Sequence, residues 1–288
     1  MTSRIDRRGF LVGAGGAAAA TWLGPFGAGR ADANGEGDPS EFFFLVAADP
    51  QLFWGPVELW QKTIDHANRL KPAFLVVCGD LIHELGTEEQ ARAYLGVAGK
   101  LDKSIPLRNV AGNHDVYSEP TPKSLAWYEE RFGKPWYSFT HGGCLFLVLE
   151  SNLLSQPQRA PEMAERQTAW LEKTLESASQ QRFHHIIVFQ HVPLCLDRVD
   201  EPDGYFNVPG PRRKELLDLL HRHGVRAVFS GHHHRNAYAK DGDIELVTTS
   251  SCCKPLGKDP TGLRIVKVFG DHIEHRYYGF EEMPEKVD

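Results

Sequence analysis

Short apolar runs alternate with polar segments along most of the chain, and five of these runs are followed directly by clusters of polar residues. The five runs cover residues 42–47, 74–78, 107–111, 185–189 and 225–229. Their length and their content of aromatic and β-branched residues are typical of buried strands. The longer segments between them carry helical patterns. This alternation predicts an α/β protein.

Local signals place several other elements. A capping box at residues 87–90 predicts a helix that runs to about residue 101, and Pro161 predicts the start of another. A third helix is expected over 211–223, with four leucines as its buried stripe. Residues 136–140 and 144–149 form a predicted hairpin around Gly142 and Gly143. The last three predicted strands, 244–249, 263–269 and 272–278, lack intervening helices and suggest antiparallel pairing, so we expect two packed sheets with helices outside.

The polar clusters after the five strands contain side chains that bind divalent metals. They are Asp49-Pro50-Gln51, Gly79-Asp80, Gly112-Asn113-His114-Asp115, His191 and Gly231-His232-His233-His234. Polar residues at strand ends meet at one edge of a sheet, where α/β proteins place their sites. Carboxylates, amides and imidazoles gathered there predict ligands for a pair of divalent metals, and hence an enzyme.

The order of these motifs resembles that of the calcineurin-like metallophosphoesterase superfamily, except that Gln51 stands where the superfamily usually has His. The Asp-Pro-Gln variant and the segments 77–83, 229–236, 262–264 and 275–278 resemble one branch more closely. That branch contains the calcineurin-like phosphoesterase domain-containing proteins described as serine/threonine phosphatases in animals. The resemblance spans nearly all of the chain from Phe42 onward. It implies a four-layer α/β/β/α sandwich of two mixed sheets.

The resemblance also implies a ligand set for two metals. Asp49, Gln51, Asp80 and His234 would hold one metal, and Asp80, Asn113, His191 and His232 would hold the other. Two cations that share a ligand lie close together and repel each other unless negative charge lies between them. A carboxylate has two oxygens with which to bridge them. If the strand stays extended, His232 and His234 project to one face and His233 points away.

Gln51 bears on the identity of the metals. An amide oxygen is a harder and less basic donor than imidazole, so we expect a labile first metal and a preference for manganese or magnesium over zinc. The cofactors expected are two divalent ions, with manganese or iron favoured and zinc or magnesium as alternatives. The alternative interpretation is that Gln51 only hydrogen-bonds a metal-bound water.

His114 has no metal in this scheme and is the expected catalytic residue, which would stabilise charge on the phosphoryl group or protonate the leaving alkoxide. Asp115 would orient His114 or accept hydrogen bonds behind it. His83 and Glu84 stand where the well-known serine/threonine phosphatases have an Asp that supports this His and an Arg that grips phosphate. Purple acid phosphatases would have their ligating Tyr at position 83.

The expected function is hydrolysis of phosphate monoesters, with phosphorylated small molecules or phosphoproteins as substrates, by attack of a metal-bound hydroxide. A phosphodiesterase or nucleotide pyrophosphatase acting with the same metals is the first alternative. A non-catalytic metal-binding protein is the second. The combination of a bridging Asp80 with a non-ligand His114 argues against it, because metal storage has no use for His114.

The N-terminus predicts export. Arg7-Arg8-Gly9-Phe10-Leu11 is a twin-arginine pattern, a Gly- and Ala-rich stretch follows, and Ala31-Asp32-Ala33 is a candidate cleavage site. We therefore expect a signal peptide at 1–33, a linker at 34–41, a metallophosphoesterase domain at 42–288, and a periplasmic or secreted protein. The alternative is an uncleaved membrane anchor, but the stretch is Gly-rich and interrupted by Pro25, so no stable membrane association is expected.

Charge and cysteine content narrow the picture further. The net charge is −6 and there is no basic run, so polymeric nucleic acid is a poor substrate. Of the five cysteines, Cys78 and Cys144 lie in apolar runs, whereas a disulfide between Cys195 and Cys252 or Cys253 stays open. Residues 194–210 form a long loop rich in Asp, Pro and Gly, either a substrate-facing flap or a passive surface loop. The sequence leaves the oligomeric state open.

Overall fold

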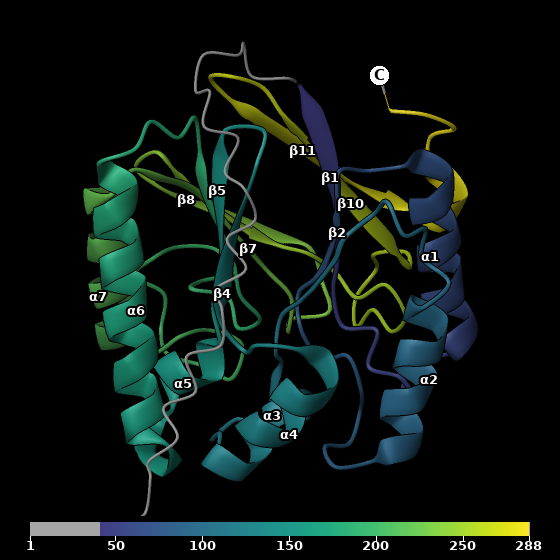
Figure 1. Ribbon diagram of the computed structural model, residues 1–288, viewed down its shortest axis with the longest axis horizontal. Coiled ribbons are helices and arrows are strands. Elements are labelled where there is room, and N and C mark those ends of the chain that lie inside the picture. Colours follow the sequence, from purple (N-terminus) through teal and green to yellow (C-terminus); the bar gives the residue numbers. More distant parts are fainter. Residues whose placement is uncertain (1–40, 288) are drawn as a thin grey trace, which may run out of the picture. The chain divides into compact units, whose positions relative to one another are not determined.

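The computed structural model describes residues 41–287, which form two β-sheets flanked by helices (Figure 1). The predicted signal peptide and all of the predicted linker except Glu41 lie outside the described residues. The strands are β1 (Phe42–Ala47), β2 (Leu75–Val77), β3 (Leu107–Asn109), β4 (Tyr137–His141), β5 (Cys144–Val148), β6 (Ile186–Phe189), β7 (Val225–Ser230), β8 (Ala237–Asp241), β9 (Ile244–Thr248), β10 (Gly262–Val268) and β11 (Ile273–Gly279). The helices are α1 (Val57–Leu70), α2 (Glu88–Ala98), α3 (Asn113–Val116), α4 (Pro122–Phe132), α5 (Ser151–Ser155), α6 (Pro161–Ser179) and α7 (Gly210–Arg222).

Both sheets are mixed. The five-stranded sheet has the order β11-β10-β1-β2-β3, in which β1, β2 and β3 run parallel and β10 and β11 pair antiparallel. The six-stranded sheet has the order β4-β5-β6-β7-β9-β8, with a parallel centre and antiparallel β4 and β8 at its edges. The parallel strands of each sheet therefore end on one side, which is where the polar clusters follow.

Apolar side chains fill the space between the sheets and under the helices on both outer faces. Phe44 of β1 lies between the sheets, with its ring centroid 5.8 Å from that of Phe146 and 5.7 Å from that of Phe189. Helices α1 and α2 cover the outer face of the five-stranded sheet, and α6 and α7 cover that of the six-stranded sheet (Figure 1). The α/β/β/α sandwich that the sequence predicted is confirmed.

The helix predictions hold in position but not in every detail. Helix α6 begins at Pro161, and the four leucines of α7 are buried as expected. Helix α2 follows Thr87, but the predicted capping box does not form, because the Thr87 side chain makes no capping hydrogen bond. Instead, Gln90 Oε1 accepts hydrogen bonds from the backbone N–H groups of His83 and Glu84, each at 2.9 Å. Gln90, the last residue of the predicted capping box, therefore binds the loop before the helix instead of capping the helix end.

The pairing of the late strands was predicted incorrectly in one case. Strands β10 and β11 pair antiparallel as expected, but β9 lies in the other sheet and runs parallel to β7. The unpredicted strand β8 forms a hairpin with β9 and occupies the sheet edge, where its mixed burial leaves little periodic signal. Among residues 41–287, none of the helices combines the length and apolar character needed to cross a bilayer.

Candidate metal centre

The predicted ligands lie together at the ends of the parallel strands. One ligand atom from each of Asp80, His191 and His232 lies within 4.8 Å of the others, and the same holds for Asp49, Asp80 and His234. All five side chains are buried. Asp80 belongs to both groups, which is the position a bridging carboxylate needs.

Three imidazoles at this centre are each oriented by a backbone carbonyl. Nδ1 of His191 lies 2.8 Å from Cys78 O, Nδ1 of His234 lies 2.7 Å from Lys254 O, and Nε2 of His232 lies 2.9 Å from Tyr205 O. A carbonyl only accepts, so the ring nitrogen beside it carries the proton and the other nitrogen offers a lone pair. Metal-binding histidines are typically held in this way.

Two of those other nitrogens lie close to carboxylates. Nε2 of His191 lies 3.3 Å from Asp80 Oδ1, and Nε2 of His234 lies 3.3 Å from Asp49 Oδ1. Lone pairs and carboxylates placed so close repel each other unless positive charge lies between them. The donor arrangement therefore fits divalent cations.

The pKa values of these carboxylates and imidazoles are shifted by their burial and by one another's charges. Although burial alone would raise it, the His191 imidazole lowers the pKa of Asp80. Burial opposes protonation of His191, but the Asp80 carboxylate outweighs it and raises the pKa of His191 to about 10. Burial, partly offset by His234, raises the pKa of Asp49 to about 6, and burial together with His191 lowers that of His232 to about 3. The Asp80 carboxylate therefore favours positive charge beside it, which is either a proton on His191 Nε2 or a cation that would take the place of that proton.

Left-handed backbone turns direct these predicted ligands toward one another. Positive φ angles occur at Asp49 (50°), Gln51 (40°), Asp80 (52°), His232 (65°) and His234 (54°). Non-glycine residues adopt such angles rarely, and they concentrate at functional sites where the surrounding structure holds them in place. The prediction that His232 and His234 converge through extended alternation was wrong, because both leave the strand and turn.

Two glycines permit the close approach of the ligand loops. A Cβ atom on Gly79, where φ is +83°, would lie 2.3 Å from His191 Nδ1. A Cβ atom on Gly112 would lie 2.2 Å from Asp80 Oδ1. Neither glycine can be replaced without moving a predicted ligand.

The two predicted amide ligands also reach the centre. Asn113 Oδ1 lies 3.0 Å from His191 Nε2. Gln51 is 2% exposed, its Nε2 lies 3.2 Å from His83 Nδ1, and its Oε1 is buried without a hydrogen-bond partner. A buried amide oxygen without a partner is costly, so this atom fits a ligand position.

His114 is anchored beside the centre rather than within it. Its backbone N–H donates to Asp80 Oδ1 at 2.9 Å, and its Nδ1 lies 2.6 Å from His83 O. That carbonyl fixes the proton on Nδ1 and leaves Nε2 available. Of the two roles expected for Asp115, the hydrogen bonds fit that of an acceptor behind His114: its carboxylate accepts from the N–H groups of Leu81 (3.0 Å), Ile82 (3.2 Å) and Gly112 (2.8 Å). Burial and the Asp80 charge raise the pKa of Asp115 to about 8.

The flap (residues 194–210) faces the site. In addition to the carbonyl that holds His232, Tyr205 places its ring centroid 4.9 Å from that of His232. Arg213 of α7 anchors the flap by donating to the carbonyls of Val199 (2.8 Å), Glu201 (3.1 Å) and Val208 (3.1 Å).

Sequence reasoning missed two aromatic side chains at this site, Trp54 and Tyr205. The Trp54 ring lies 5.2 Å from that of His234 and 6.0 Å from that of His83, measured between centroids. Trp54 follows the predicted ligand Gln51 by only three residues, and this proximity in sequence could have indicated that it lies near the site. Tyr205 had no such signal, because only the fold brings the flap to His232.

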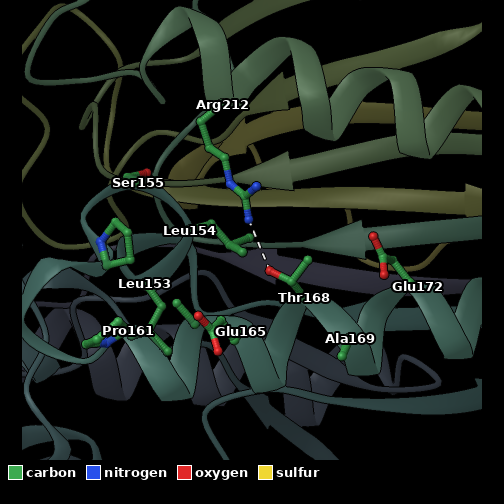
Figure 2. A pocket seen from close by; sticks show the side chains of 11 residues that line it. Leu153, Leu154, Ser155, Pro161, Glu165, Thr168, Ala169, Glu172 and Arg212 are labelled. Carbon is green, nitrogen blue, oxygen red and sulfur yellow. Dashed lines mark hydrogen bonds between the residues drawn. The ribbon is translucent and has the colours of Figure 1, made fainter.

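The remaining candidates play no part in the centre. All five cysteines are buried free thiols, so Cys195 is not bridged to Cys252 or Cys253. Arg235 donates to the carbonyl of Leu256. A cavity of about 600 Å³, lined among others by Leu154, Thr168 and Arg212, lies beside α5, α6 and α7 and contains none of the predicted ligands (Figure 2).

The fold and the paired ligand groups define a metal-dependent phosphoester hydrolase. The calcineurin-like phosphoesterase family model matches residues 44–236, and the chain belongs to that family. It is 40% identical over 268 residues to the serine/threonine-protein phosphatase CPPED1 of Rattus norvegicus, covering 85% of this chain and 86% of the relative. The Homo sapiens protein of that name is 38% identical over 271 residues, with the same coverages.

Solved structures show the same fold. A dimetal phosphatase from Danio rerio superimposes with a TM-score of 0.60 at 17% identity, covering 83% of this chain and 96% of that one. The purple acid phosphatase PPD1 of yellow lupin superimposes with a TM-score of 0.65 at 15% identity, covering 86% of this chain and 53% of that one.

Proposed function

We propose that this protein is a dinuclear metal-dependent phosphomonoesterase that acts on phosphorylated small molecules or phosphoproteins. The observation that carries the proposal is that Asp80 is shared by two groups of buried ligands. The relatives named serine/threonine phosphatases support a phosphorylated substrate.

The ligands divide between two metal positions. Asp49, Gln51, Asp80 and His234 would hold the first metal, and Asp80, Asn113, His191 and His232 the second. When bound, two divalent cations supply Lewis acidity toward the phosphoryl group and activate water at neutral pH. A mixed set of carboxylate and amide oxygens with imidazoles suits manganese or iron, with zinc or magnesium as alternatives.

His114 serves the leaving group. Its Nδ1–H is held by the His83 carbonyl, so Nε2 is the atom that donates to a phosphoryl oxygen or to the departing alkoxide. The exposed ring of Tyr205 borders the second metal position and would contact the esterified group. Together, the residues of this chain orient the ester, exclude part of the water and supply one proton.

Turnover of p-nitrophenyl phosphate and of its bis-ester by the manganese-loaded protein tests this function. Faster hydrolysis of the monoester is expected, and phosphopeptides would then be the next substrates. Faster hydrolysis of the diester would indicate a phosphodiesterase. Hydrolysis of neither compound, with two metals bound, would leave a non-catalytic metal-binding protein.

We also propose that the chain is exported by the twin-arginine route to the periplasm or beyond. Support comes from the sequence at residues 7–11 and 31–33. Fusion of residues 1–40 to a reporter that is active only after export tests this proposal. Replacing Arg7 and Arg8 with lysines should abolish export, and unchanged export would refute it.

A further inference from the structure

The orientation of the Gln51 carboxamide depends on one neighbour. A carboxamide presents an oxygen on one side and an NH₂ group on the other, so its neighbours decide which side faces the metal. Gln51 Nε2 lies 3.2 Å from His83 Nδ1, while Oε1 is buried and has no partner. Because the amide nitrogen only donates, His83 Nδ1 is the acceptor.

His83 is itself held in place on several sides. Its ring stacks between that of His114 (5.1 Å between centroids, 19° between planes) and that of Trp54 (6.0 Å, 22°). Its backbone N–H donates to Gln90 Oε1, and its carbonyl accepts from His114. The ring cannot turn away without breaking this stack.

We propose that His83 is a positioning residue that turns Oε1 of Gln51 toward the first metal position. The proposal rests on the proposed function, because it takes Gln51 as a ligand of that metal. An imidazole at position 51 would not need this partner, since a change of tautomer gives either ring nitrogen a lone pair. Gln51 and His83 thus form one functional pair. His83 fixes the orientation of the amide, and this lets Gln51 act as a metal ligand.

Calorimetric titration of the full chain with Mn²⁺ tests the pair. His83→Phe keeps a flat ring between Trp54 and His114 but removes the acceptor, and it should weaken one of two Mn²⁺ sites by about 10–100-fold. His83→Asn, which offers an oxygen near the position of Nδ1, should restore most of the affinity. His66→Phe is the matched control, because the His66 ring also stacks on an aromatic ring, that of Phe280, but away from the centre; it should leave both affinities unchanged.

A double-mutant cycle separates positioning from direct binding. In a Gln51→His background, His83→Phe should change the weaker Mn²⁺ affinity by less than about threefold, since the amide is gone. The same large loss in that background, or no loss in the original chain, would overturn the proposal. If His83→Phe fails to fold, His83→Leu replaces it in the same cycle.

Gln51→Leu distinguishes the two proposals. Unchanged Mn²⁺ binding by this variant would refute Gln51 as a ligand, and the positioning role would fall with it. Weaker binding by Gln51→Leu together with unchanged binding by His83→Phe would refute the positioning role alone and leave the metal centre as proposed.

Discussion

Arg213 is predicted to hold the flap over the metal centre. Its guanidinium is 1% exposed, and it donates through Nε to Val208 O and through Nη1 to Val199 O and Glu201 O. A hydrogen bond from a charged group contributes about 1.5–3 kcal/mol. Two donor nitrogens at the lower figure give about 3 kcal/mol, which Arg213→Met removes while keeping the buried apolar stem.

The expected effect is local. A loss of about 3 kcal/mol raises the population of the open flap about 100-fold, because each factor of ten corresponds to about 1.4 kcal/mol. Hydrogen exchange at Leu196 and Val208, whose amides bond within this region, should therefore accelerate about 100-fold while exchange in β1 stays constant.

Arg212→Met is the matched control for this experiment. Arg212 is the neighbour on α7, but its side chain bonds Glu215 and Thr168 instead of the flap. Exchange at Leu196 and Val208 should be unchanged in this variant. Equal protection of the flap in both variants would refute the anchoring role of Arg213, as would faster exchange throughout the chain.

Three further predictions concern catalysis and stability. His114→Ala should lower turnover of p-nitrophenyl phosphate by about 10²–10⁴-fold with bound manganese unchanged; loss of manganese would contradict its non-ligand role. The His275 hydrogen bond lowers the pKa of Glu245, so this interaction stabilises the fold above the ordinary pKa of 4.5 and is lost as pH falls through the lowered value. Glu245→Gln should therefore lower the melting temperature at neutral pH but not in strong acid, and an equal decrease at both would contradict this. Phe44→Ala should cost about 3–5 kcal/mol in urea unfolding, whereas a cost below about 1 kcal/mol would contradict its place between the sheets.

Much of the fold could be predicted because the signals are local. The strand over 42–47 appears with those bounds as β1, and Pro161 opens α6. Buried parallel strands are nearly continuous apolar runs, and proline at a helix start is pre-organised for it. Strand β8 was missed because its sheet-edge position leaves only one residue fully buried.

The site shows the same division between local and long-range information. The predicted ligands could be selected by their positions after strands, but the means by which the structure brings them together could not. His232 and His234 are directed by left-handed turns, and His232 is oriented by Tyr205, 27 residues away in sequence. Similarly, the Gln51–His83 contact joins loops 32 residues apart. Such contacts depend on tertiary packing, which periodicity does not encode.

Turnover of p-nitrophenyl phosphate as a function of manganese bound per chain is the most direct test of a centre built on a shared Asp80. We expect little activity with one equivalent bound and full activity only as the second site fills. In Asp80→Asn we also expect turnover to be lost, and we expect binding of manganese at one site no longer to affect binding at the other. Full activity with a single bound ion, or unchanged binding and turnover in Asp80→Asn, would contradict the dinuclear centre.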